Sequence, residues 1–501
     1  MKNRDTTIIV RNYLRSTGMK SRLLVGCITC LLPVGRVNGH EPDSPTAPLP
    51  TEAETPSTEA PKLFVEGRYA EALAAAEREH AAIVARSGPD HADSLQAANN
   101  LAVIQARAGK LADAKALATA TLDARRKLLG PDHPDVFTTL NNLGTIQHTL
   151  GDYAEAEKTL QEAYDGRKRL LGDKHPSTAQ SMANLGRVMM ARGKRAEGVK
   201  LLEEALAIQL ADPSTPKTSL ASTKCSVARA KVESSGALAT QDAQDARESA
   251  AAAFGESHPR YALALSLLAE SRSLPDARDD FSRARAIHKT AGAGLTPDYA
   301  TTLMLHADHA VGLELGLVEN PGEEDVRSVR QVGEEAYDVC GRVFGDNHPT
   351  TATAGNDFAL TLNIEPDRDR VRAKRLVEEA MAIRRSRLGD NHPATAESDI
   401  NLAAIRFDDT GSVPLEDLAP AMIAFERAFE ADDPNAVSLG INLASIYFVA
   451  KVPSERILSI IDRIVPVSQK RFGAEDQRSR LLERMRAALE PPPPSKPAKR
   501  T

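Results

Sequence analysis

The stretch LGPDHPDVFTTLNNLG, residues 129–144, decides the fold because versions of it recur along the chain. Residues 87–102 read SGPDHADSLQAANNLA, residues 171–186 read LGDKHPSTAQSMANLG, and residues 388–403 read LGDNHPATAESDINLA. Each version has a histidine in a loop and an asparagine directly before a leucine. None of them carries a catalytic signature, so the recurrence itself needs an explanation.

Three unrelated residue types keep a common spacing of 42 residues. The residues at this spacing are His91, His133 and His175, then Gly67, Gly109, Gly151 and Gly193, and then Asn100, Asn142 and Asn184. A period between 20 and 50 residues is typical of a solenoid or an array of repeats. The series continues less regularly, with room for a degenerate copy around Pro216, at His258, His348, His392, Asp433 and Asp476.

Each repeat predicts two helices, as residues 134–172 illustrate. Pro134 suits the first position of a helix, where its missing N–H needs no partner, so His133 is the expected cap residue. Apolar residues then recur at helical spacing until the glycine of LGDY, residues 150–153, interrupts them. A second amphipathic segment follows, and Gly172 can adopt the left-handed conformation that ends a helix.

The composition favours helices over sheets. Aromatic residues make up only 4% of the chain, tryptophan is absent, and alanine and leucine are abundant. The formal net charge of −6 argues against a nucleic-acid partner, which would need a basic surface. A single helix pair cannot bury its apolar face alone, whereas a stack of pairs buries a continuous core.

The repeat resembles the tetratricopeptide repeat, whose paired helices place Leu, Gly or Ala, Ala, a bulky residue and Ala at fixed offsets. The matching residues are Leu143, Gly144, Ala156, Leu160 and Ala163, followed in the next copy by Leu185, Gly186, Gly198, Leu202 and Ala205. The 42-residue period resembles the long variant found in kinesin light chains and many bacterial proteins. The resemblance covers about residues 63–490, although copies between 212 and 335 lose the Gly-x-Tyr turn. It implies an all-α fold, a right-handed superhelical solenoid of antiparallel helix pairs with about nine or ten repeats.

The resemblance also implies a function. In this family the first helix of each repeat lines a concave groove, and an asparagine before the signature leucine hydrogen-bonds the backbone of an extended peptide. The candidate groove residues are Asn100, Asn142, Asn184, Asn401, Asn442, Asn99, Asn141 and Arg187, with Thr145, His148 and Gln180 nearby. The alternative is that each asparagine caps or bridges repeats, because side-chain amides often bond local backbone. We expect a non-catalytic scaffold that binds a peptide or a partner surface.

Neither catalytic residues nor a cofactor are expected. The sequence contains no P-loop, Gly-rich dinucleotide turn, HExxH, GxSxG or kinase signature. The loop histidines lie in successive repeats, about 10 Å or more apart. They cannot share a zinc ion, whose ligands lie within about 2.3 Å. The motif HADH, residues 306–309, places two histidines one helical turn apart, but the repeat alignment predicts that one is buried and only one is exposed.

The N-terminal residues 1–39 resemble an export signal, with MKSR, LLVGCITCLLPVG and RVNG in succession from Met19. The apolar run is shorter than the roughly 20 residues needed to span a bilayer. The expected location is periplasmic or secreted, or cytoplasmic if this segment is not a signal. LVGC also resembles a lipoprotein box, so Cys27 is an alternative lipid anchor. A second functional hypothesis is an envelope-anchored or signalling-associated assembly factor that works with a separate catalytic chain.

The chain therefore divides into segments of different character. Residues 40–61, rich in Pro, Thr and Glu, predict a disordered linker, and residues 491–501 predict a disordered tail. Between them lie well-formed repeats over 62–211, degenerate repeats over 212–335, and repeats with a terminal helix over 336–490. The remaining cysteines, Cys225 and Cys340, are too few for a disulfide framework.

Overall fold

A computed structural model describes residues 59–235, 239–272, 276–310, 323–363, 368–410, 412–430, 433, 435–474 and 477–489. This part of the chain forms twenty-one α-helices and one short 3-10 helix, with no strand. The predicted export segment with Cys27, the predicted C-terminal tail and Asp476 lie outside the described residues. None of the described helices combines the length and the apolar character that crossing a bilayer requires.

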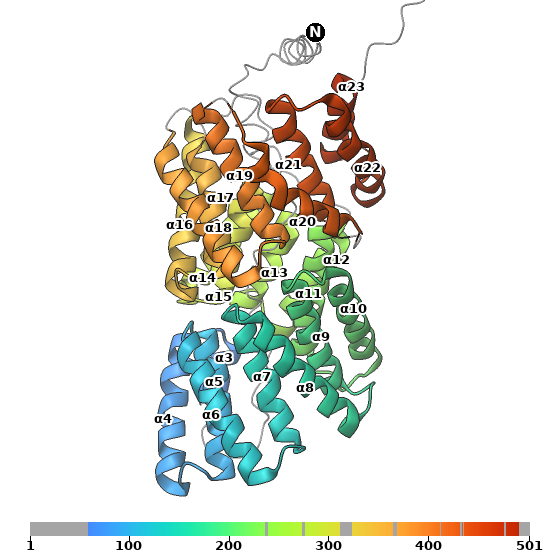
Figure 1. Cartoon of the computed structure of the whole chain (residues 1–501). Helices are drawn as coiled ribbons and strands as arrows, with labels where there is room; N and C mark the ends of the chain where they lie inside the picture. Colours follow the sequence, from blue (N-terminus) through green and yellow to red (C-terminus); the bar gives the residue numbers. More distant parts are fainter. Residues whose placement is uncertain are drawn as a thin grey trace, which may run out of the picture.

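The helices follow one another as ten packed hairpins and a terminal helix (Figure 1). We number the hairpins 1 to 10 and call the two helices of each hairpin A and B. Hairpins 1 to 5 are α3 (Glu59–Val65) with α4 (Tyr69–Ser87), α5 (Ala92–Arg107) with α6 (Leu111–Leu129), α7 (Pro134–Thr149) with α8 (Tyr153–Leu171), α9 (Pro176–Ala191) with α10 (Arg195–Ala211), and α11 (Lys217–Ser235) with α12 (Thr240–Phe254). Hairpins 6 to 10 are α13 (Pro259–Glu270) with α14 (Asp276–Thr290), α15 (Pro297–His309) with α16 (Glu323–Phe344), α17 (Pro349–Leu362) with α18 (Arg370–Leu388), α19 (Pro393–Thr410) with α20 (Ala419–Glu430), and α21 (Asn435–Val449) with α22 (Ser454–Phe472). The 3-10 helix η3 (Leu415–Leu418) precedes α20, and α23 (Gln477–Leu489) follows hairpin 10.

This arrangement confirms the predicted all-α solenoid of helix pairs. The stretch 212–335, which departs from the repeat pattern, nevertheless forms hairpins 5 and 6 and most of hairpin 7. At the N-terminal end, α3 begins at Glu59, inside the range 40–61 that the sequence assigns to a linker. Leu63 and Phe64 of this helix are buried in the same apolar cluster as Tyr69, which explains why helical structure starts early.

The loop histidines cap the helices that follow them, as predicted. Nδ1 of His133 accepts the backbone N–H of Asp135 at 3.2 Å, with Pro134 in the first turn of α7. The same bond, at 3.0 to 3.2 Å, is made by His91, His175, His258, His348 and His392. In hairpin 10 Asp433 takes this place and accepts from the N–H of Asn435 at 2.8 Å. The cap uses the lone pair of a neutral imidazole, or a carboxylate oxygen, to satisfy an N–H that the helix itself leaves without a partner.

Buried arginines fasten helix B to the next helix A. Arg167 on α8 donates to the carbonyl of Ser177 at 2.9 Å and to the hydroxyl of Ser181 at 3.0 Å, both on α9. The equivalent Arg125 and Arg384 make the same pair of bonds to the following helix A. Burial removes water from the guanidinium of Arg167 and lowers its pKa to about 10. The hydrogen bonds to α9 take the place of that water.

The ten hairpins wind through two superhelical turns of five hairpins each. The glycine between helices A and B of hairpins 1 to 4 lies against the loop that precedes helix A five hairpins later. The pairs are Gly67 with Pro259, Gly109 with Leu295, Gly151 with His348, and Gly193 with His392. We call this line of contacts the seam. Figure 1 shows the result, with α4 to α8 in the lower part of the molecule and α16 to α23 in the upper part.

Candidate functional site

The predicted groove residues all lie on helices A. Asn99 and Asn100 are on α5, Asn141 and Asn142 on α7, Asn184 and Arg187 on α9, Asn401 on α19, and Asn442 on α21. Asn100 is partly exposed, and each of the others is at most 6% exposed. The site is therefore a set of amides with one arginine on the helices A of hairpins 2 to 4, 9 and 10, nearly all of them buried.

Several of these amides bond one another across neighbouring hairpins. Asn142 donates from Nδ2 to Oδ1 of Asn99 at 3.1 Å, and Asn184 donates to Oδ1 of Asn141 at 2.9 Å. Arg187 in turn donates to Oδ1 of Asn184. These amides therefore bridge neighbouring repeats.

The same bridge recurs in the second turn. Asn401 donates to Oδ1 of Asn356 at 3.3 Å, although Asn356 was not among the predicted groove residues. We call this set the amide row; its members are Asn99, Asn100, Asn141, Asn142, Asn184, Asn356, Asn401 and Asn442.

Four polar atoms of the amide row are buried without a hydrogen-bond partner among the described residues. They are Nδ2 of Asn141 and of Asn356, and Oδ1 of Asn142 and of Asn442. Buried side-chain polar atoms are nearly always partnered, and one that is not costs about 1–3 kcal/mol. The row thus offers donors and acceptors alike, which is what a peptide backbone needs.

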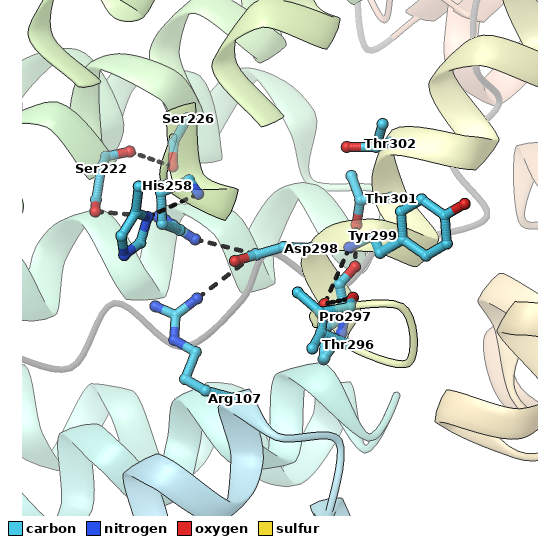
Figure 2. A network of polar contacts seen from close by, with 12 residues as sticks. Arg107, Ser222, Ser226, His258, Thr296, Pro297, Asp298, Tyr299, Thr301 and Thr302 are labelled. Atoms are coloured by element: carbon cyan, nitrogen blue, oxygen red, sulfur yellow. Dashed lines mark hydrogen bonds and ion pairs between the residues drawn. The ribbon is translucent and has the colours of Figure 1, made fainter. Parts of the chain in front are cut away.

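A charged cluster lies beside the amide row, where the two turns meet. Figure 2 shows Arg107, at the end of α5, reaching Asp298 at the start of α15. The Nη1 atoms of Arg107 and Arg260 lie 3.6 and 3.4 Å from the same Oδ1 of Asp298. All three side chains are at most 8% exposed. Burial, and then the neighbouring Arg260, lower the pKa of Arg107 to about 10, while Asp298 opposes this shift.

Sequence reasoning missed this cluster and the buried arginines of helix B. Arg107 and Asp298 are brought together only by the winding of the solenoid, and no local pattern relates them. The helix B arginines did leave a signal, because Arg125, Arg167 and Arg384 each stand five residues before the glycine that ends the helix. An arginine at one repeat position with no acidic partner in the pattern could have been recognised as structural.

The two histidines of HADH do not behave as expected. His306 and His309 are both buried, at 8% and 6% exposed, so the prediction that one is exposed is wrong. Phe281 of α14 explains the burial, since its ring stacks on His306 at 4.7 Å and lies 5.3 Å from the ring of His309. Among the described residues, no group of three or more His, Cys, Asp or Glu side chains is placed to hold a metal ion.

Comparison with protein families agrees with this geometry. A family model described as the tetratricopeptide repeat matches residues 93–169 and 135–211, which span hairpins 2 to 4. A second tetratricopeptide repeat model matches residues 368–394 in the second turn. The chain is a tetratricopeptide repeat protein.

Two solved structures show similar repeats. Both are crystal structures of nearly identical TPR-like repeats attributed to a kinesin light chain of Podosopora anserina, and one of them carries a single substitution. They are 23% and 24% identical to this tetratricopeptide repeat protein, cover 40% of it and 96% and 98% of their own chains, and have TM-scores of 0.31 and 0.30. No curated protein sequence matches the chain.

Proposed function

We propose that this tetratricopeptide repeat protein is a non-catalytic scaffold that binds an extended segment of a partner protein along the amide row. The fold supports a protein-interaction scaffold in general, and the amide row supports the more specific proposal. The observation that carries it is the set of unpartnered amide atoms on α7, α17 and α21, all of them helices A. A strand-like peptide presents N–H and C=O groups alternately, so amides can bind it without reading its side chains.

Asn442→Ala is the sharpest test of this proposal. Oδ1 of Asn442 has no partner among the described residues, so its removal costs the fold little and costs a bound peptide one hydrogen bond. We expect the variant to bind peptides selected from a mixed-sequence array more weakly, by roughly 5- to 10-fold per lost bond. Its thermal midpoint should stay close to that of the unmodified protein.

A matched control is Asn391→Ala, since Asn391 lies exposed in the loop before α19 and outside the amide row. Its affinity for the same peptides should be unchanged. A photo-crosslinker at Asn100, the partly exposed member of the row, should capture the bound peptide. Equal affinity in Asn442→Ala, Asn142→Ala and the control would place binding elsewhere.

We also propose that the protein is exported, with residues 1–39 removed. The support is the order of basic, apolar and polar segments from Met19. Mass spectrometry of the protein from its native cell should find a mature N-terminus near His40 and no lipid on Cys27. A lipid on Cys27 would favour the anchored assembly factor instead.

A further inference from the structure

The seam between the two turns is built from small, repeated contacts. A β-carbon on Gly67 would lie 2.4 Å from Cδ of Pro259, and one on Gly109 would lie 2.8 Å from the carbonyl oxygen of Leu295. These distances are shorter than any ordinary contact, so only glycine lets the turns approach so closely. The third contact is as close, at 2.9 Å from Nε2 of His348 for a β-carbon on Gly151, and only the fourth, at 3.7 Å for Gly193, is looser.

Charged side chains reinforce the seam at two places. Arg107 of hairpin 2 pairs with Asp298 of hairpin 7. Arg387 of hairpin 8 lies 3.4 Å from Oδ1 of Asp152 in hairpin 3. At the far end, α11 of hairpin 5 contacts α22 of hairpin 10, and the pKa of Asp433 is raised by burial against the opposing effect of Arg195.

The loop histidines show what the seam covers. The side chains of His91 and His133, in the first turn, are 52% and 38% exposed. His258 and His348 carry the same motif and make the same cap, yet these residues are 3% and 2% exposed. Stacking on Phe254 and Phe344, whose ring centroids each lie 4.9 Å from that of the histidine, accounts for part of this burial. The seam contacts of the two loops add to it.

The seam is nevertheless much less continuous than the packing within a turn. A cleft of about 850 Å³ opens between α6 and the loop before α17, with Lys115, Asp152, Asn347 and Arg387 in its lining. The described apolar clusters join neighbouring hairpins, and few of their members cross the seam; Phe344, packed on the cluster of hairpins 2 and 3, is one. Across the seam the turns therefore hold each other mainly through loops and charges, whereas hairpins 5 and 6, which join one turn to the next, share apolar clusters.

We infer that the seam is a latch, which opens so that the two turns separate while the hairpins of each turn stay folded. Opening would also give a partner access to the amide row, whose members other than Asn100 are at most 6% exposed in the closed form. This second part depends on the proposed function, and the latch itself does not.

The test adds bulk at the seam without changing any hairpin. Asparagine tolerates the left-handed conformation better than other non-glycine residues, so the variant is Gly109→Asn with Gly151→Asn. The control is Gly292→Asn. The φ angle of Gly292 is +67°, close to +83° for Gly109 and +76° for Gly151. Gly292 ends its helix with the same pair of backbone hydrogen bonds as these two glycines. A β-carbon added to it would have nothing within 4 Å.

We expect the double variant to have a larger radius of gyration in small-angle X-ray scattering than the control, with the same helical circular dichroism. An unchanged radius of gyration, or loss of helix in step with expansion, would overturn the latch. A second pair of variants is His348→Ala and His133→Ala. Each removes the histidine that caps a helix A, but His348 is buried at the seam and His133 is exposed. Only His348→Ala should expand the molecule.

Peptide binding separates the two parts of the inference. The array-selected peptides should bind the double variant more tightly than the control. In the control part of the binding free energy is spent on opening the seam, whereas the double variant is already open. Expansion without tighter binding would leave the latch standing and contradict access through it. Tighter binding that is then lost on adding Asn442→Ala would support both the latch and the proposed site.

Discussion

Histidines of one motif occupy two environments in this molecule, and burial lowers the pKa of those at the seam. Burial lowers the pKa of His258 to about 4 and that of His348 and His392 to about 3, from an ordinary value of 6.5. Below pH 6.5 the unfolded chain takes up protons that the folded chain cannot. The stability that these residues contribute is therefore complete above pH 6.5 and is lost as the pH falls towards 4 and 3.

His348 allows this pH dependence to be tested. Arg387 and His148 face its ring and lower the pKa beyond the effect of burial, while the Thr149 backbone opposes them. Each such histidine should cost on the order of 1 kcal/mol of unfolding free energy per pH unit below 6.5. Urea unfolding at pH 7, 6 and 5 should show a shallower pH dependence in His348→Asn, which keeps a capping acceptor. A slope in His348→Asn equal to that of the unmodified protein would contradict the assignment.

At the scale of the helices, a buried guanidinium stabilises the contact between two helices more than an exposed ion pair does. Arg167 joins α8 to α9 through bonds to the Ser177 carbonyl and the Ser181 hydroxyl, and this hydroxyl also donates to Oδ1 of Asn141. Arg169, two residues later, reaches Asp132 at 2.9 Å, but both side chains are more than two-thirds exposed. Exposed pairs contribute little because water already solvates both charges.

Replacing each arginine by methionine should separate these two roles. Arg167→Met leaves the Ser177 carbonyl and the Ser181 hydroxyl with fewer partners, and we expect a loss of about 2–3 kcal/mol in unfolding free energy. Arg169→Met should change it by less than about 1 kcal/mol. Chemical denaturation followed by circular dichroism measures both, and similar losses would mean that Arg167 acts only as a surface charge.

The helices also show how far the sequence can be read. The spacing of His133, Gly151 and Asn142 predicts where each helix A begins and ends and that repeats stack, because those features depend on neighbours within one period. Burial of both His306 and His309 was not predictable, since it depends on the placement of Phe281 in the preceding hairpin. The bonding of the amide row was open for a different reason, because an asparagine can bond a neighbouring amide as readily as a peptide.

At the scale of the whole molecule, contacts between distant hairpins decide the shape, and these left no pattern in the sequence. Gly109 meets Leu295 five hairpins later, and Arg107 meets Asp298 in the same contact. A 42-residue period says nothing of how many repeats complete a turn. The sequence therefore predicted the hairpins well and the seam not at all.

Asp298→Ala tests how strongly the two turns depend on the charged cluster. The substitution leaves Arg107 and Arg260 buried without their shared carboxylate, and we expect it to cost about 3–5 kcal/mol. Asp132→Ala, which removes an exposed partner of Arg169, should cost less than about 1 kcal/mol. Guanidinium chloride is unsuitable because it screens charge, so urea unfolding is the measurement. A loss below about 1 kcal/mol in Asp298→Ala would mean that water reaches the cluster.

The turn of hairpin 10 carries Lys451 at the position that Gly151 holds in hairpin 3, with φ 58 and an exposed side chain. The first-turn loops at the opposite edge, such as that of His133, are exposed copies of the loops that dock on glycine. A molecule with glycine on both edges could accept another copy end to end and grow into a filament without limit. We expect the long cationic side chain of Lys451 to disfavour such docking on hairpin 10.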